Sequence, residues 1–79
     1  MANVDTSTST NPRKTLRQQR SRETVERILE AAAHIFNERG YTEATTNEIA
    51  DEADVSIGSL YQYFPNKDAL LLALAHKHI

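Results

Sequence analysis

Four consecutive residues, Ser56, Ile57, Gly58 and Ser59, combine side chains that can read DNA bases with one residue that has no side chain. The Ser59 hydroxyl can donate to or accept from a base or a phosphate, and Ile57 can contact a thymine methyl group. Gly58 is costly inside a helix, by roughly 1 kcal/mol relative to alanine, but it lets a backbone approach DNA closely. If these residues begin a helix, that helix is suited to the major groove.

A second polar group, Thr45, Thr46 and Asn47, lies upstream of the first. If a helix begins here, its free backbone amides and its dipole favour a bound phosphate. Thr45 also has a purely structural interpretation, because Thr45 and Glu48 match the capping box that starts helices in any protein. We therefore interpret the group as a candidate phosphate site whose first residue also serves the fold.

Two tyrosines and a lysine follow. Tyr61 and Tyr63 are two positions apart and so point about 200° apart on a helix, which predicts different roles. We expect Tyr61, four residues after Ile57, to share the DNA side, and Tyr63 to reach a phosphate with its hydroxyl while its ring packs at the margin. Lys67 opposes the dipole of the helix that it begins, and an anionic partner would relieve this mismatch. Taken singly these are ordinary packing residues and a solvated charge, so the prediction rests on their joint arrangement.

The element upstream of these residues is predicted from the spacing of apolar side chains. They recur every three or four residues, which is typical of one helix face, and predict a helix over about 22–39. Ser21 can cap its start, and Gly40 supplies a left-handed stop. The apolar positions are Val25, Ile28, Leu29, Ala32, Ile35 and Phe36.

Two short helices are predicted next, over about 46–53 and about 57–64. A turn of about three residues between two such helices is the signature of a helix-turn-helix motif, whose second helix is the recognition helix. Pro65 prevents the recognition helix from continuing, and Asn66 can cap a fourth helix from about residue 67.

The predicted fold class is therefore all-α, a small helix-turn-helix bundle. We assign residues 21–79 to a three-helix DNA-binding domain plus the start of a fourth helix, with Leu60 and Phe64 on the buried face of the recognition helix. Residues 1–20 are predicted to be a disordered polar and basic arm. For residues 13–22 the sequence leaves open whether they continue this arm or lead into the first helix.

Charge is distributed unevenly along the chain. Residues 1–22 hold five basic side chains against Asp5, a net charge of +4, whereas residues 23–79 hold four basic and ten acidic side chains, a net charge of −6. This balance argues against indiscriminate binding of polyanions. If DNA is the partner, the basic arm and a few well-placed side chains must supply the attraction.

Several classes of function are excluded by what is missing. The chain has no cysteine, and its histidines, His34, His76 and His78, lack the spacing of a zinc site, so we expect no metal. It also lacks a nucleophile and base at motif spacing and a glycine-rich phosphate loop, so we expect neither enzyme activity nor a cofactor. No apolar run has the length of a signal peptide or membrane span, which predicts a cytoplasmic protein with no membrane partner.

The segment 44–72, ATTNEIADEADVSIGSLYQYFPNKDALLL, resembles the DNA-binding region of TetR-family transcriptional repressors, and the resemblance covers roughly residues 22–79. The family pattern contains a threonine-led helix, VSxGxLYxYF and a lysine that opens the next helix. One departure is Asp54, where the family usually has glycine in the turn. Aspartate tolerates the left-handed conformation better than most residues, so we expect the turn to survive with an added negative charge near DNA.

The resemblance implies a function and a set of contacts. It implies a ligand-responsive regulator, most often a repressor, that binds double-stranded operator DNA as a homodimer and is released by a small-molecule effector. The effector-binding and dimerisation domain is C-terminal in the family, and we expect it to be absent from these 79 residues. The matching phosphate contacts are Thr46, Ser56, Tyr61, Tyr63 and Lys67, and the matching base contacts are Asn47, Ile57, Gly58 and Ser59.

A different class of function remains open. The acidic charge of residues 23–79 and the leucines of the segment DALLLALAHKHI also fit a small helical module that docks on a protein partner or on itself. Such a module predicts that Leu71 and Leu74 matter more than Ser59 and Tyr61.

Overall fold

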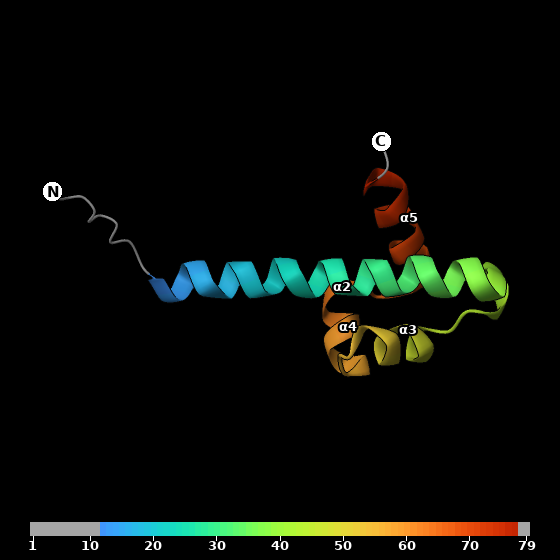
Figure 1. Cartoon of the computed structure of the whole chain (residues 1–79), viewed down its shortest axis with the longest axis horizontal. Coiled ribbons are helices and arrows are strands. Elements are labelled where there is room, and N and C mark those ends of the chain that lie inside the picture. The colour runs from blue at the N-terminus through green and yellow to red at the C-terminus, as the bar shows by residue number, and fades with distance from the viewer. Residues whose placement is uncertain (1–11, 78–79) are drawn as a thin grey trace, which may run out of the picture.

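In the computed structural model, the described backbone covers residues 12–77 and the described side chains cover residues 19–77. The backbone forms the helices α2 (Pro12–Glu43), α3 (Thr46–Ala53), α4 (Ile57–Tyr63) and α5 (Lys67–Lys77). Figure 1 shows α3 and α4 following one side of the long α2, while α5 crosses α2 and projects away from them. The all-α fold class is confirmed, and the bounds of α3, α4 and α5 lie within one residue of those predicted.

The N-terminal end of α2 differs from the predicted disordered arm. The helix begins at Pro12, so residues 12–20 are helical, which is the second of the two alternatives that the sequence left open. Proline is favoured at the first position of a helix, and extending a helix that already exists needs no new nucleus. The expectation of disorder for residues 12–20 is therefore wrong, and residues 1–11 lie outside the described part of the chain.

Gly40 interrupts α2 near its C-terminal end. Its backbone has φ 80° and ψ 161°, which is not helical, and residues 41–43 form a last short turn beyond it. A Cβ atom added to Gly40 would meet nothing within 4 Å. The glycine is therefore required by its backbone conformation and not by lack of space.

Local hydrogen bonds define the ends of the two short helices. The Thr45 hydroxyl accepts from the Glu48 backbone amide at 3.1 Å, and the Glu48 carboxylate accepts from the Thr45 amide at 3.2 Å, which completes the predicted capping box. Asp54 ends α3 in the left-handed conformation, with φ 61° and ψ 45°. The Asn66 side chain accepts from the Ala69 amide at 2.9 Å at the start of α5.

The core lies where α3, α4 and α5 meet α2. Its largest fully buried side chains, Ile28, Ile49, Leu60 and Leu70, come one from each helix. Phe64 is also buried, so both apolar residues assigned to the inner face of the recognition helix lie inside. Among residues 12–77, no helix is apolar enough over a sufficient length to cross a membrane.

Candidate nucleic-acid interface

The first turn of α4 is organised by two serines. The Ser56 hydroxyl accepts from the Ser59 backbone amide at 3.0 Å and donates to the Ser59 hydroxyl, also at 3.0 Å. Ser56 therefore caps the helix, and its proton is used inside the chain. The Ser59 oxygen accepts this bond and keeps its own proton for another acceptor. Of the two serines, Ser59 is the better donor to a base or a phosphate.

Gly58 lies between them and is exposed. A Cβ atom built there would approach nothing more closely than the Ser56 hydroxyl oxygen, at 3.9 Å. Neither backbone conformation nor packing within residues 19–77 requires glycine at this helical position. Glycine costs about 1 kcal/mol relative to alanine in a helix interior, and nothing in the described fold compensates for it at this position.

Ile57 is only partly available for its predicted base contact. The side chain is half-buried and packs against the hydrophobic core cluster. Only its outer part can reach a thymine methyl group. Asn47 is exposed in the first turn of α3, as a base contact requires.

Tyr61 joins the two predicted contact regions. Its hydroxyl lies 2.8 Å from the Thr46 hydroxyl, and 47% of its surface is exposed. This hydrogen bond holds the side of α4 against the first residue of α3. The structure thus brings together a residue of the predicted recognition helix and a residue of the candidate phosphate site that are 15 positions apart in the sequence.

Tyr63 points elsewhere. Its hydroxyl donates to the Ser21 hydroxyl of α2 at 3.4 Å. Arg20 and Arg22, which flank Ser21, are exposed. The two tyrosines therefore have different partners, Thr46 of α3 for Tyr61 and Ser21 of α2 for Tyr63.

Lys67 already has partners inside the chain. Its ammonium group donates to the Tyr41 carbonyl oxygen at 2.8 Å and to the Thr42 carbonyl oxygen at 3.3 Å. The same nitrogen lies 4.6 Å from the centroid of the Tyr41 ring. Sequence reasoning missed Tyr41, whose only signal was its place directly after the glycine that ends the regular helix.

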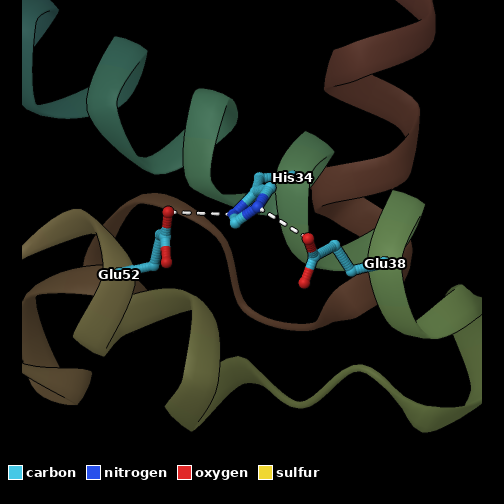
Figure 2. A network of polar contacts seen from close by, with 3 residues as sticks. All are labelled: His34, Glu38 and Glu52. Carbon is cyan, nitrogen blue, oxygen red and sulfur yellow. Dashed lines mark hydrogen bonds and ion pairs between the residues drawn. The ribbon is translucent and has the colours of Figure 1, made fainter.

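Figure 2 shows a polar network that joins α2 to α3. His34 lies between two carboxylates, with Nδ1 2.9 Å from Glu52 and Nε2 3.3 Å from Glu38. Arg27 adds a further link, because its Nε donates to the Ala53 carbonyl oxygen at 3.2 Å. These contacts fix the C-terminal end of α3 while its N-terminal end carries the polar group. Among the described residues, no set of three potential ligands is arranged to hold a metal ion.

Comparison with known proteins identifies the family. Residues 28–74 match the family model described as bacterial regulatory proteins, tetR family, and this match covers more than half of the chain. The chain belongs to the TetR family. The matched region contains α3, α4 and all ten predicted contact residues.

Several curated TetR-family relatives align with this chain. The transcriptional repressor KstR of Mycobacterium tuberculosis is 44% identical over 52 residues, which are 66% of this chain and 24% of the relative. The transcriptional activator FasR of Mycolicibacterium smegmatis is 46% identical over 52 residues, with the same coverage of 66% and 24%. The uncharacterised regulator YvkB of Bacillus subtilis is 42% identical over 57 residues, 72% of this chain and 30% of the relative. The chain thus spans less than a third of the length of these regulators, whose names include both a repressor and an activator.

Substitutions of Asp54, the turn residue at which this chain differs from the family pattern, test how this residue affects stability and DNA affinity. We expect Asp54→Asn to leave the free energy of unfolding within about 0.5 kcal/mol of wild type, because asparagine also tolerates a positive φ. DNA affinity should rise a few-fold at low salt, since one negative charge near DNA is removed. Thermal unfolding and a fluorescence-anisotropy titration measure the two quantities. Asp54→Ala is the control, and it should destabilise the domain by about 1 kcal/mol or more. An unchanged affinity for Asp54→Asn would show that this charge does not reach the DNA.

Proposed function

We propose that the face formed by the first turns of α3 and α4, together with Tyr61, Tyr63 and Lys67, binds double-stranded operator DNA with α4 in the major groove. The observation that carries this proposal is Gly58, an exposed helical glycine for which the described fold offers no internal reason. A backbone that must lie directly against DNA accounts for it.

The proposed contacts fall into two classes. Base edges are read by Asn47, Ile57, Gly58 and Ser59, and phosphates are bound by Thr45, Thr46, Ser56, Tyr61, Tyr63 and Lys67. Thr45 and Ser56 have their hydroxyls engaged as helix caps. Their backbone positions, at the positive ends of the two helices, support a role in orienting phosphates.

We further propose that the protein is a repressor that acts as a symmetric homodimer and releases DNA when a small molecule binds. In a dimer of this motif, two recognition helices meet half-sites about 34–36 Å apart, or a multiple of that distance. Dimerisation and effector binding are placed in sequence beyond these 79 residues, in keeping with the greater length of the relatives. The name of KstR supports repression, whereas that of FasR supports activation.

The test is a titration of this chain with randomised duplex DNA over a series of salt concentrations, followed by selection of the bound sequences. Enrichment of one site, with log affinity falling linearly against log salt concentration, supports the proposal. A palindromic site supports the symmetric dimer. If no duplex binds at low salt while circular dichroism shows a folded helical chain, the DNA-binding proposal is contradicted for this chain. A reporter gene placed behind the selected site then distinguishes repression from activation.

The N-terminal residues give a second test. Deleting residues 1–20 should weaken binding to all DNA sequences by about tenfold and reduce the slope of the salt dependence by about 0.9 for each phosphate that the segment neutralises. The segment holds Arg13, Lys14, Arg17 and Arg20, and the deletion stops before Ser21, where α2 meets Tyr63. Anisotropy titrations of the two chains on specific and random duplexes measure the effect. An unchanged slope would exclude this segment from the interface.

A second candidate function rests on α5. Leu71 and Leu72 are 47% and 62% exposed, so adjacent leucines leave apolar surface uncovered on α5. A protein-interaction module would use this face, so Leu71→Asp would abolish association with the partner while Tyr61→Ala would not. The DNA-binding function predicts the reverse for operator affinity.

A further inference from the structure

Three residues outside the recognition helix form a compact polar and aromatic cluster, which we call the Tyr41 clamp: Tyr41, Lys67 and Asp68. The Tyr41 hydroxyl donates to the Asp68 carboxylate. Lys67 donates to the backbone carbonyl oxygens of Tyr41 and Thr42 and lies over the Tyr41 ring. A further neighbour of that ring is Phe36 of α2, whose ring centroid is 5.4 Å away. The clamp thus connects the first turn of α5 to the chain that leads from α2 into α3.

The segment that the clamp holds, Tyr41 and Thr42, directly follows the glycine that interrupts α2. Gly40 breaks the helix with a positive φ of 80°, and its carbonyl oxygen accepts from the Ala44 amide at 3.1 Å. Glycine is also the residue with the greatest backbone freedom. From Thr42 only two residues separate the clamped carbonyl from Thr45, whose hydroxyl starts α3. The clamp therefore holds the backbone close to the start of α3, together with the burial of Ala44 and the ion pair between Arg39 and Glu48.

We propose that the Tyr41 clamp positions the N-terminus of α3 for phosphate binding, so that Tyr41 and Asp68 are positioning residues for DNA recognition and Lys67 acts through the backbone of Tyr41 and Thr42. The proposal rests on the proposed DNA-binding function. It changes the role of Lys67: with two carbonyl oxygens within 3.3 Å, its ammonium group has one proton left to donate. In this proposal the main contribution of Lys67 to binding is geometric, and a direct ion pair with a phosphate is the alternative that the experiment below tests.

The salt dependence of binding separates the two roles of Lys67. A lysine that neutralises one phosphate contributes about 0.9 to the slope of log affinity against log salt concentration, whereas a positioning lysine contributes nothing to it. The duplex used is the one that the wild-type chain enriches from random DNA. We expect Lys67→Met to bind this duplex about tenfold more weakly, with an unchanged slope of log affinity against log salt concentration. Lys77→Met is the matched control, because it removes a lysine from the far end of α5 and should leave the affinity unchanged.

A double-mutant cycle tests whether Lys67 acts through Tyr41. Tyr41→Leu removes the ring and the bond to Asp68 but keeps both carbonyl oxygens, so it should weaken binding less than Lys67→Met. The double variant should be no weaker than Lys67→Met, because both changes release the same segment. All titrations are made at a temperature at which circular dichroism shows each variant to be folded. A slope reduced by about 0.9 in Lys67→Met, with additive effects in the double variant, would overturn the proposal and make Lys67 a direct phosphate ligand.

A spectroscopic signature checks the clamp without DNA. The hydrogen bond to Asp68 raises the pKa of the Tyr41 phenol above its ordinary value of 10.0, and desolvation and the negative charge of Asp68 act in the same direction. In the DNA-free chain, the Tyr41 Cζ resonance should therefore titrate at higher pH in wild type than in Asp68→Asn. An identical titration in the two chains would show that the clamp does not form. Failure of the wild-type chain to bind any duplex would instead contradict the proposed DNA-binding function, so the two failures are distinguishable.

Discussion

Tyr61→Ala should weaken operator binding by roughly two orders of magnitude while the domain remains folded. The side chain is 47% exposed and is not part of the buried core, so its removal should cost about 1 kcal/mol of stability, for the hydrogen bond to Thr46 and the covered part of the ring. A hydrogen bond to a charged phosphate is worth about 1.5–3 kcal/mol, and each 1.4 kcal/mol corresponds to a factor of about ten in affinity. The variant also lacks the bond that holds Thr46 in place.

Two further variants make this result interpretable. Tyr61→Phe keeps the ring and removes only the hydroxyl, so it should show most of the decrease in affinity if the hydroxyl binds the phosphate. Gln62→Ala is the matched control, because Gln62 is an exposed neighbour on the same helix that belongs to no proposed contact. Anisotropy titrations measure affinity and thermal unfolding measures stability. Wild-type affinity in Tyr61→Ala would remove Tyr61 from the interface and favour the protein-interaction function.

The features that could be predicted from the sequence are those decided by near neighbours. Both caps of the helix-turn-helix motif are hydrogen bonds between residues three positions apart, Thr45 with Glu48 and Ser56 with Ser59. Such local bonds depend on residue type and spacing, which is why the bounds of α3 and α4 could be predicted closely. The inward position of Leu60 follows from helical periodicity in the same way.

The features that sequence reasoning missed depend on packing between distant parts of the chain. The dipole mismatch at Lys67 suggests a need for an external anion, yet the structure supplies the carbonyl oxygens of Tyr41 and Thr42, which are 26 and 25 positions away. The bond between Tyr63 and Ser21 spans 42 positions. No spacing rule connects such pairs, because they meet only when the helices have packed. Composition is also a poor guide to residues 12–20, since polar residues can extend a helix that a packed segment has already nucleated.

Gly58→Ala should separate stability from DNA binding, because the two are expected to change in opposite directions. Alanine is favoured over glycine in a helix by about 1 kcal/mol, and the added Cβ atom would make only an ordinary contact, 3.9 Å from the Ser56 hydroxyl oxygen, so the domain should become more stable. If the Gly58 backbone lies against DNA, the same atom enters a close-packed interface, where one added carbon costs about 1–3 kcal/mol. Affinity should then fall by roughly 30-fold.

The size of the added side chain distinguishes contact with DNA from a change inside the chain. Gly58→Leu introduces another good helix former, so the domain should again be at least as stable as wild type, yet operator binding should fall by more than about 100-fold because a larger group cannot fit between α4 and the groove. A glycine kept for folding would behave differently, with both substitutions lowering the unfolding temperature. A glycine with no role would leave both quantities unchanged. If either variant is more stable and binds the operator as tightly as wild type, the α4 backbone does not approach DNA at Gly58, and the placement of this helix in the major groove is wrong.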